Sequence, residues 1–174
     1  MLKSLKDLPF PDPFYSGAVG FIGRTLEELH ADMHKLDLPT NAPKNVCKLH
    51  DAIRHGYIYS YYSYDLLILA ANQTFPCLEM ALKARIGGQF EGRVNKKGEP
   101  NPPMLKELLE AAKTQQLIKS DIKHLNTWRN DYAHGSETIL SPPMFLQLFD
   151  WVTQIIRELF DADSHSKRNE AAKK

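Results

Sequence analysis

Residues 57–87 read YIYSYYSYDLLILAANQTFPCLEMALKARIG, and this stretch decides the fold class. No glycine interrupts it before Gly87, and its second half is rich in Leu, Ala and Met, which have high helix propensity. The tyrosine-rich start would also suit a β-strand, but the rest of the chain offers no alternating partner strand or hairpin signal. We therefore predict one long helix, kinked at Pro76 and ended by Gly87 and Gly88.

Downstream of this stretch, loops alternate with amphipathic segments. Residues 87–103, GGQFEGRVNKKGEPNPP, predict an exposed and mobile loop. Residues 104–118 predict a helix, because one face collects the apolar residues Leu105, Leu108, Leu109, Ala112 and Leu117. A further helix is predicted from Ser120 to Gly135. A last helix follows residues 141–143, outlined by Phe145, Leu148, Phe149, Val152, Ile155, Ile156 and Leu159.

Upstream of residue 57, prolines and glycines break the chain into loops and short helices. Thr25 followed by Glu28 is a capping-box signature, and it predicts a helix that ends before Pro39. A second short helix is predicted from Pro43 to Gly56. The sequence thus predicts an all-α fold: a helical bundle of four or five main helices in residues 57–160, with residues 1–56 as a helical and loop extension packed on the same domain. The charged residues 161–174 lack apolar periodicity and predict a disordered tail.

Composition limits the classes of protein that fit this chain. With 174 residues, 43% hydrophobic and 25% charged, it suits one globular domain and excludes wholesale disorder. A formal charge of +1 excludes a protein that coats DNA by sheer positive charge, although a local nucleic-acid site stays open. The chain has no apolar run of about 20 residues and its start lacks a signal peptide, so we expect no membrane partner and a cytoplasmic location. Cys47 and Cys77 are expected to stay reduced.

One cation falls on an apolar helix face. At about 100° per residue, the helix from Ser120 groups Leu125, Trp128 and Tyr132 within roughly 60° of one another, and Ile122 and Ala133 complete the apolar arc. Arg129 lies inside this arc, between Leu125 and Ile122 in projection. A buried carboxylate partner, a protein interface or a pocket for an anionic ligand would compensate for its desolvation. His134 closes the same helix, where the carbonyl end favours imidazolium, as it also would for a plain helix-terminal histidine.

Polar residues on the long helix supply a candidate partner for Arg129. Asp65, Asn72 and Glu79 are spaced by seven residues and fall within about 40° of one another. One interpretation is a solvated face on which Glu79 and Lys83 form an ordinary (i, i+4) pair. The alternative is that Asp65 or Glu79 orients Arg129 in a groove between the two helices.

The segment WRNDYAHG, residues 128–135, resembles the Arg-polar-x3-His signature of the HEPN superfamily of small helical proteins. Many members of this superfamily are metal-independent ribonucleases of toxin-antitoxin or anti-phage systems. The resemblance extends over roughly residues 57–160, and it matches Arg129 and His134 to the catalytic pair and Asn130 to its polar companion. Family members controlled by adenylylation carry a tyrosine two residues after the histidine, where this chain has Ser136, so that mode of control is not expected here.

The resemblance implies an endoribonuclease that cleaves RNA by attack of the 2′-hydroxyl on the adjacent phosphorus, without metal or cofactor. Histidine moves protons near neutral pH and arginine stabilises phosphoryl oxygens. Because one histidine cannot easily be both base and acid, the resemblance implies a homodimer with a composite active site. An antitoxin or defence-system protein would be a further partner.

Two alternatives belong to other classes of protein. The first is a non-catalytic HEPN-like module that dimerises or binds RNA or a partner protein, since fold does not imply function. The second is a metal site, for which His30, His34, Cys47 and His50 are suitable ligand types. The chain has no HExxH and no paired CxxC, so we expect no metal.

Overall fold

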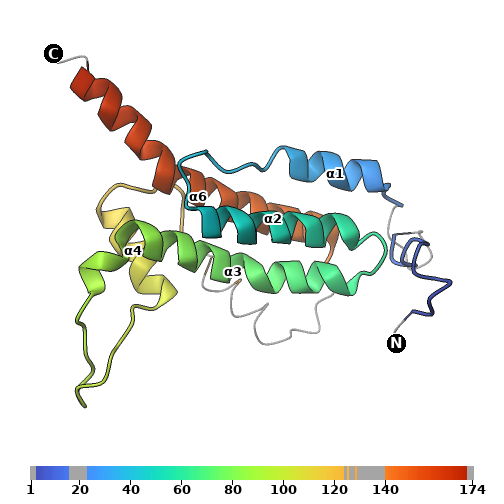
Figure 1. The fold of residues 1–174 in the computed structure, drawn as a ribbon, viewed down its shortest axis with the longest axis horizontal. Coiled ribbons are helices and arrows are strands. Elements are labelled where there is room, and N and C mark those ends of the chain that lie inside the picture. Colours follow the sequence, from blue (N-terminus) through green and yellow to red (C-terminus); the bar gives the residue numbers. More distant parts are fainter. Residues whose placement is uncertain (1–2, 16–22, 124, 126–127, 129–139, 172–174) are drawn as a thin grey trace.

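The computed structural model of the chain is all-α, as predicted (Figure 1). It describes residues 3–15, 23–123, 125, 128 and 140–171, of which residues 162–171 are described by their backbone alone. The helices are α1 (Leu26–His34), α2 (Lys44–Tyr59), α3 (Asp65–Ile86), α4 (Leu105–Thr114) and α6 (Pro142–Ala171), and the 3-10 helix η1 (Gly87–Phe90) follows α3. None of the described helices combines the length and the hydropathy that a membrane span requires.

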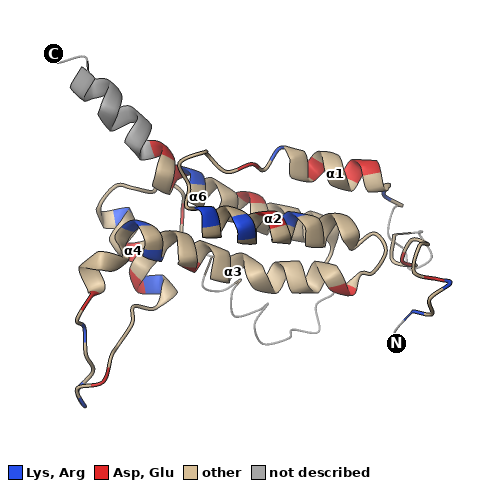
Figure 2. Cartoon of the chain, in the orientation of Figure 1, with Lys and Arg blue, Asp and Glu red and all other residues tan. Residues whose placement is uncertain are grey.

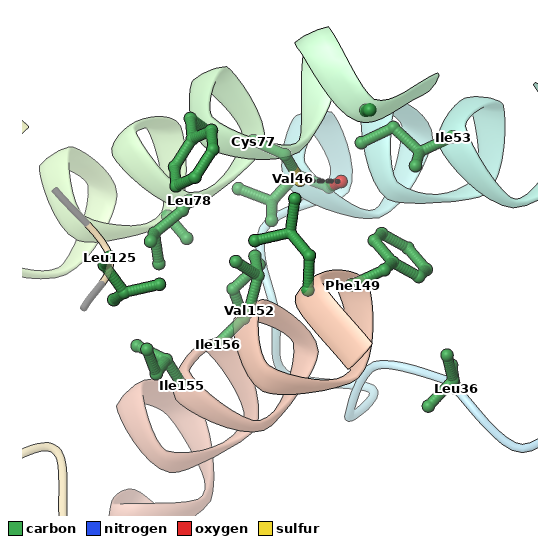
Figure 3. Packing of buried hydrophobic residues seen from close by; sticks show 14 of the residues in the cluster. Leu36, Val46, Ile53, Cys77, Leu78, Leu125, Phe149, Val152, Ile155 and Ile156 are labelled. Atoms are coloured by element: carbon green, nitrogen blue, oxygen red, sulfur yellow. Dashed lines mark hydrogen bonds between the residues drawn. The ribbon is translucent and has the colours of Figure 1, made fainter. Parts of the chain in front are cut away.

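The core lies between α2, α3 and α6, which run side by side in Figure 1. The apolar face predicted for α6 is confirmed, since its side chains are all 0% exposed: Phe145, Leu148, Phe149, Val152, Ile155, Ile156 and Leu159. Figure 3 shows Val152 and Ile156 of α6 directed toward Val46 of α2 and Leu78 of α3. Each such side chain contributes about 1.5–3 kcal/mol when it is fully buried, so this face holds the bundle together.

The predicted boundary between Gly56 and Tyr57 is wrong. α2 continues through Gly56 to Tyr59, and α3 begins only at Asp65 after a short turn. A Cβ atom at Gly56 would lie 3.1 Å from the Cβ atom of Ala70, so glycine lets α2 and α3 approach closely at this crossing. The division of the chain at residue 56 therefore falls inside a core helix.

Tyr57 lies in α2, and its ring is part of the core. The side chain is 0% exposed and stacks on Phe145 with ring centroids 5.2 Å apart. Its hydroxyl donates a hydrogen bond to Asp32 Oδ2 at 3.0 Å, and Arg24 pairs with the same carboxylate at 2.7 Å. Tyr57 thereby joins α1, α2 and α6.

The residues before α2 also pack on the bundle. The capping box of α1 is confirmed, since the Glu28 amide donates to Thr25 Oγ1 and the Thr25 amide donates to Glu28 Oε2. Residues 3–15 cover the turn between α2 and α3, where the Tyr64 amide donates to Asp12 Oδ2 at 3.1 Å. The buried hydroxyl of Tyr15 meets that of Ser60 in the same turn.

Two further predictions differ from the structure. α6 continues as helix to Ala171 where a disordered tail was predicted, and no glycine or proline after Pro143 stops it. Figure 1 shows this end of α6 projecting beyond the other helices.

The loop predicted over residues 87–103 begins with η1 and then forms a hydrogen-bonded hairpin around a β-bridge between Val94 and Pro100. Of the apolar face predicted for residues 104–118, Leu105, Leu108, Leu109 and Ala112 are confirmed as buried residues of α4. Leu117 is half-buried and lies beyond the end of α4 at Thr114.

Candidate functional site

Two apolar side chains pack against the bundle at the start of the WRNDYAHG motif, one just before it and one at its first residue. Leu125 is 0% exposed, and Figure 3 shows it beside Leu78 of α3 and Ile155 of α6. Trp128 is half-buried and meets the ring of Trp151 edge-on, with centroids 5.6 Å apart and an interplanar angle of 88°. Both residues are helical, but the prediction that the helix begins at Ser120 is wrong, since residues 120–123 are not helical. Arg129, Asn130 and His134 lie outside the described residues.

The start of this segment is held by a carboxylate of α6. Glu158 accepts hydrogen bonds from the Lys119 amide at 2.6 Å, the Ser120 amide at 3.0 Å and the Ser120 hydroxyl at 2.9 Å. On the other side, the Lys113 ammonium of α4 donates to the carbonyls of Lys119 and Ser120. Residues 119 and 120 are therefore fixed between α4 and α6, five residues before Leu125 in the chain.

The electrostatics of Glu158 favour the charged form. Burial raises the pKa of its carboxyl, but the hydrogen bonds from Ser120 and Lys119 outweigh burial and hold the pKa below its ordinary value. A charged carboxylate that accepts backbone amides is a strong acceptor. Sequence reasoning missed the contacts of Glu158 with residues 119 and 120, because Glu158 lies 38 residues from its partner Ser120.

The polar stripe predicted on α3 is solvent-facing. Asp65 and Asn72 are exposed, and Asp65 lies in the first turn of α3, where the helix dipole favours an acid. Glu79 is half-buried and pairs with Lys83 at 2.6 Å, which is the ordinary (i, i+4) pair that the sequence left open. Any contact of Asp65 or Glu79 with Arg129 involves a residue outside the described part of the chain.

The residues considered for a metal site are not brought together. His50 is 1% exposed, its Nε2 lies 3.0 Å from Thr153 Oγ1, and its ring stacks on Phe149 with centroids 4.7 Å apart. His30 and His34 instead lie on the exposed side of α1, with ring centroids 6.2 Å apart. Across the described residues, no three His, Cys, Asp or Glu side chains are placed to hold a metal ion.

His50 is a core histidine kept neutral by its surroundings. Burial lowers its pKa from 6.5 to about 4, and the nearby Arg54 and Arg157 act in the same direction. Asp51 and Asp37 oppose the shift but do not offset it. Neutral imidazole then fits the hydrogen bond to Thr153 without an uncompensated buried charge.

A polar pocket of about 490 Å³ opens between α1 and α2. His30 and His34 line one wall, and Arg54, His55 and Tyr59 line the other. The Arg54 guanidinium is already engaged, since it pairs with Asp37 at 2.7 Å and Asp51 at 3.0 Å and donates to the Met33 carbonyl. In the sequence, His30 and His34 are four residues apart, as are His55 and Tyr59. Only the packing of α1 on α2 shows that these four side chains line one pocket.

No protein-family model, no curated protein and no solved structure matches this chain.

Proposed function

We propose that this protein is a metal-independent endoribonuclease of the HEPN type, acting in the cytoplasm as a toxin of a toxin-antitoxin or anti-phage system. The observation that carries the proposal is the sequence Arg129-Asn130-x3-His134, directly after the two anchored residues Leu125 and Trp128 of an all-α bundle. Anchors of this kind support the proposal because catalytic groups need a rigid base to act on a phosphodiester.

The proposed reaction needs only two proton transfers and stabilisation of a phosphorane. The 2′-oxygen of RNA bonds to the adjacent phosphorus while the bond from phosphorus to the 5′-oxygen breaks. One His134 takes the proton of the 2′-hydroxyl, and a second His134 gives a proton to the departing 5′-oxygen. Arg129 binds the phosphoryl oxygens, whose negative charge increases in the transition state. The products are a 2′,3′-cyclic phosphate and a free 5′-hydroxyl.

The two proton carriers come from two copies of the chain in this proposal. A two-fold interface near the carboxyl end of the motif helix would bring both copies of Arg129 and His134 into one cleft. The interface would also compensate for a guanidinium on an apolar arc, which is otherwise costly to desolvate. Light scattering at micromolar concentration should therefore report a dimer, and a monomer that retains RNA cleavage would contradict this part of the proposal.

The catalytic claim is tested by cleavage of RNA in excess EDTA, with the chemistry of the ends determined. We expect cyclic-phosphate and 5′-hydroxyl ends, and Arg129→Ala and His134→Ala should each slow cleavage by roughly 10²-fold or more. His30→Ala is the matched control, since it removes an exposed histidine of α1. Circular dichroism and light scattering establish that each variant is folded and has the wild-type oligomeric state.

The outcomes separate the enzyme from a binding module. A strict requirement for Mg²⁺, or 5′-phosphate ends, would point to a different active site. If the wild type and both variants bind RNA alike and none cuts it, the protein is a non-catalytic module that binds RNA.

A further inference from the structure

Residues 93–101 form a hairpin that is organised by its own hydrogen bonds. The Asn95 amide donates to the Glu99 carbonyl at 2.8 Å, and the Asn101 amide donates to the Arg93 carbonyl at 2.9 Å. The Asn95 side chain fills the turn, because its Oδ1 accepts from the Lys97 and Glu99 amides and its Nδ2 donates to Glu99 Oε2. Gly98 takes a φ of +78°, which suits glycine. The turn therefore has a defined conformation that its own hydrogen bonds stabilise.

Within the described part of the chain, the hairpin buries almost none of its surface. All residues from 91 to 100 except Asn95 are exposed, and Val94 is 58% exposed although it is apolar. Figure 1 shows the hairpin standing away from the helices, below α4. Ordering an element costs conformational entropy, and here apolar burial offsets little of that cost. The hydrogen bonds of the hairpin instead hold its tip in solvent, where Lys96 and Lys97 are exposed.

α4 connects the hairpin to the segment that leads into the motif. At the amino end of α4, Arg93 pairs with Glu107 at 2.7 Å, and Glu107 also accepts from the Met104 amide. At the carboxyl end, Lys113 binds the carbonyls of Lys119 and Ser120. A helix of 10 residues is about 15 Å long, so one strand of nucleic acid can reach both ends.

The surface around α4 is rich in exposed lysines. Six lysines are exposed there: Lys96, Lys97, Lys106, Lys113, Lys119 and Lys123. The acidic residues of the same surface are Glu91, Glu99, Glu107, Glu110, Asp121 and Glu158. Of these, Glu107 pairs with Arg93, Glu110 pairs with Lys106, and Glu158 accepts hydrogen bonds from residues 119 and 120. Figure 2 shows blue segments at the tip of the hairpin and on and beside α4. Within the described part of the chain, Lys96 and Lys97 take part in no ion pair, and together they present two adjacent ammonium groups.

We propose that the hairpin of residues 93–101 is an RNA-binding arm whose Lys96 and Lys97 contact backbone phosphates of the strand that enters the motif. The inference rests on the proposed function, from which it takes RNA as the partner. Lysine binds phosphate as a point charge and reads no base, so the arm adds affinity and direction but no sequence preference. A strand held at the arm and along α4 would reach residues 119–123, which precede the motif in the chain.

The test measures binding without cleavage. The full chain with His134→Ala is titrated with a fluorescent single-stranded oligoribonucleotide, and anisotropy gives the dissociation constant at several NaCl concentrations. Lys96→Ala with Lys97→Ala should lower the slope of log affinity against log salt by about 1.4, since each contact on a single strand contributes about 0.7. At about 0.1 M salt, this corresponds to a loss of affinity of roughly 10- to 30-fold. Lys6→Ala with Lys35→Ala removes the same charge at exposed sites outside the arm and α4, and should change neither quantity.

Each result decides the inference independently of catalysis. An unchanged slope and affinity in the Lys96 and Lys97 variant would overturn it, as would an equal loss in the Lys6 and Lys35 control. A loss confined to the arm variant supports the arm even if the wild type cuts no RNA, in which case only the catalytic proposal fails. If the wild type cuts RNA while the arm variant binds as tightly as the His134→Ala parent, the arm fails and the catalytic proposal stands.

Discussion

Acid should destabilise this protein through one buried side chain, His50. Its pKa is lowered from 6.5 to about 4 by burial first and by Arg54 second, so the fold prefers the neutral imidazole. The stability that follows is fully present above pH 6.5 and is lost as the pH falls toward the folded pKa near 4, because the unfolded chain takes up the proton first. With about 1.4 kcal/mol for each pKa unit, the free energy of unfolding falls by about 3 kcal/mol when the imidazole is fully protonated. At pH 5 the expected loss is about 2 kcal/mol.

Urea denaturation of the wild type and of His50→Gln checks this expectation. Glutamine can hydrogen-bond to Thr153 but does not titrate, so the variant keeps only the pH dependence of the remaining groups. Between about pH 7.5 and about pH 5, the wild type should lose roughly 2 kcal/mol more than the variant. Should His50→Gln fail to fold, histidine NMR signals of the wild type provide the same test.

Two results would refute the reasoning about His50. One is an equal loss of stability in the wild type and the variant over this pH range. The other is an NMR titration of His50 with its midpoint near 6.5, which would mean that burial against Phe149 and Thr153 does not exclude the charged form.

Two further substitutions, each with a control at an exposed position, test contacts between elements of the bundle. Glu158→Ala should lower the free energy of unfolding by about 1–3 kcal/mol, because the amides of residues 119 and 120 and the Ser120 hydroxyl lose their acceptor. Glu110→Ala breaks only an exposed pair with Lys106 at 3.8 Å and should change stability by less than about 0.5 kcal/mol in the same urea titration. Gly56→Leu should cost about 1–3 kcal/mol or prevent folding, since even a Cβ atom meets Ala70 at 3.1 Å. Ala52→Leu, exposed on the same helix, should stay within about 0.5 kcal/mol, and an equal effect of the two leucines would contradict the close crossing of α2 and α3.

Local sequence patterns determined much of the fold. The spacing of Phe145, Phe149 and Val152 predicted the buried face of α6, and the pairing of Thr25 with Glu28 predicted the start of α1. Both signals work because the interacting groups lie within one or two helical turns, where the geometry of the helix fixes their relation. The resemblance of Arg129-Asn130-x3-His134 to a catalytic signature is likewise a property of consecutive residues, and it remains a prediction about chemistry.

Only the tertiary structure decided the role of residues that depend on a partner from a distant part of the chain. Gly56 predicts a helix end when it is considered alone, but it allows close packing once Ala70 lies opposite. His50 has the chemistry of a metal ligand, yet Thr153 and Phe149, far along the chain, make it part of the core. Glu158 looks like any exposed acid of α6 until it meets the amides of residues 119 and 120. In each case the free energy depends on a partner that sequence spacing does not specify, because burial and hydrogen bonding are settled by which helices pack together.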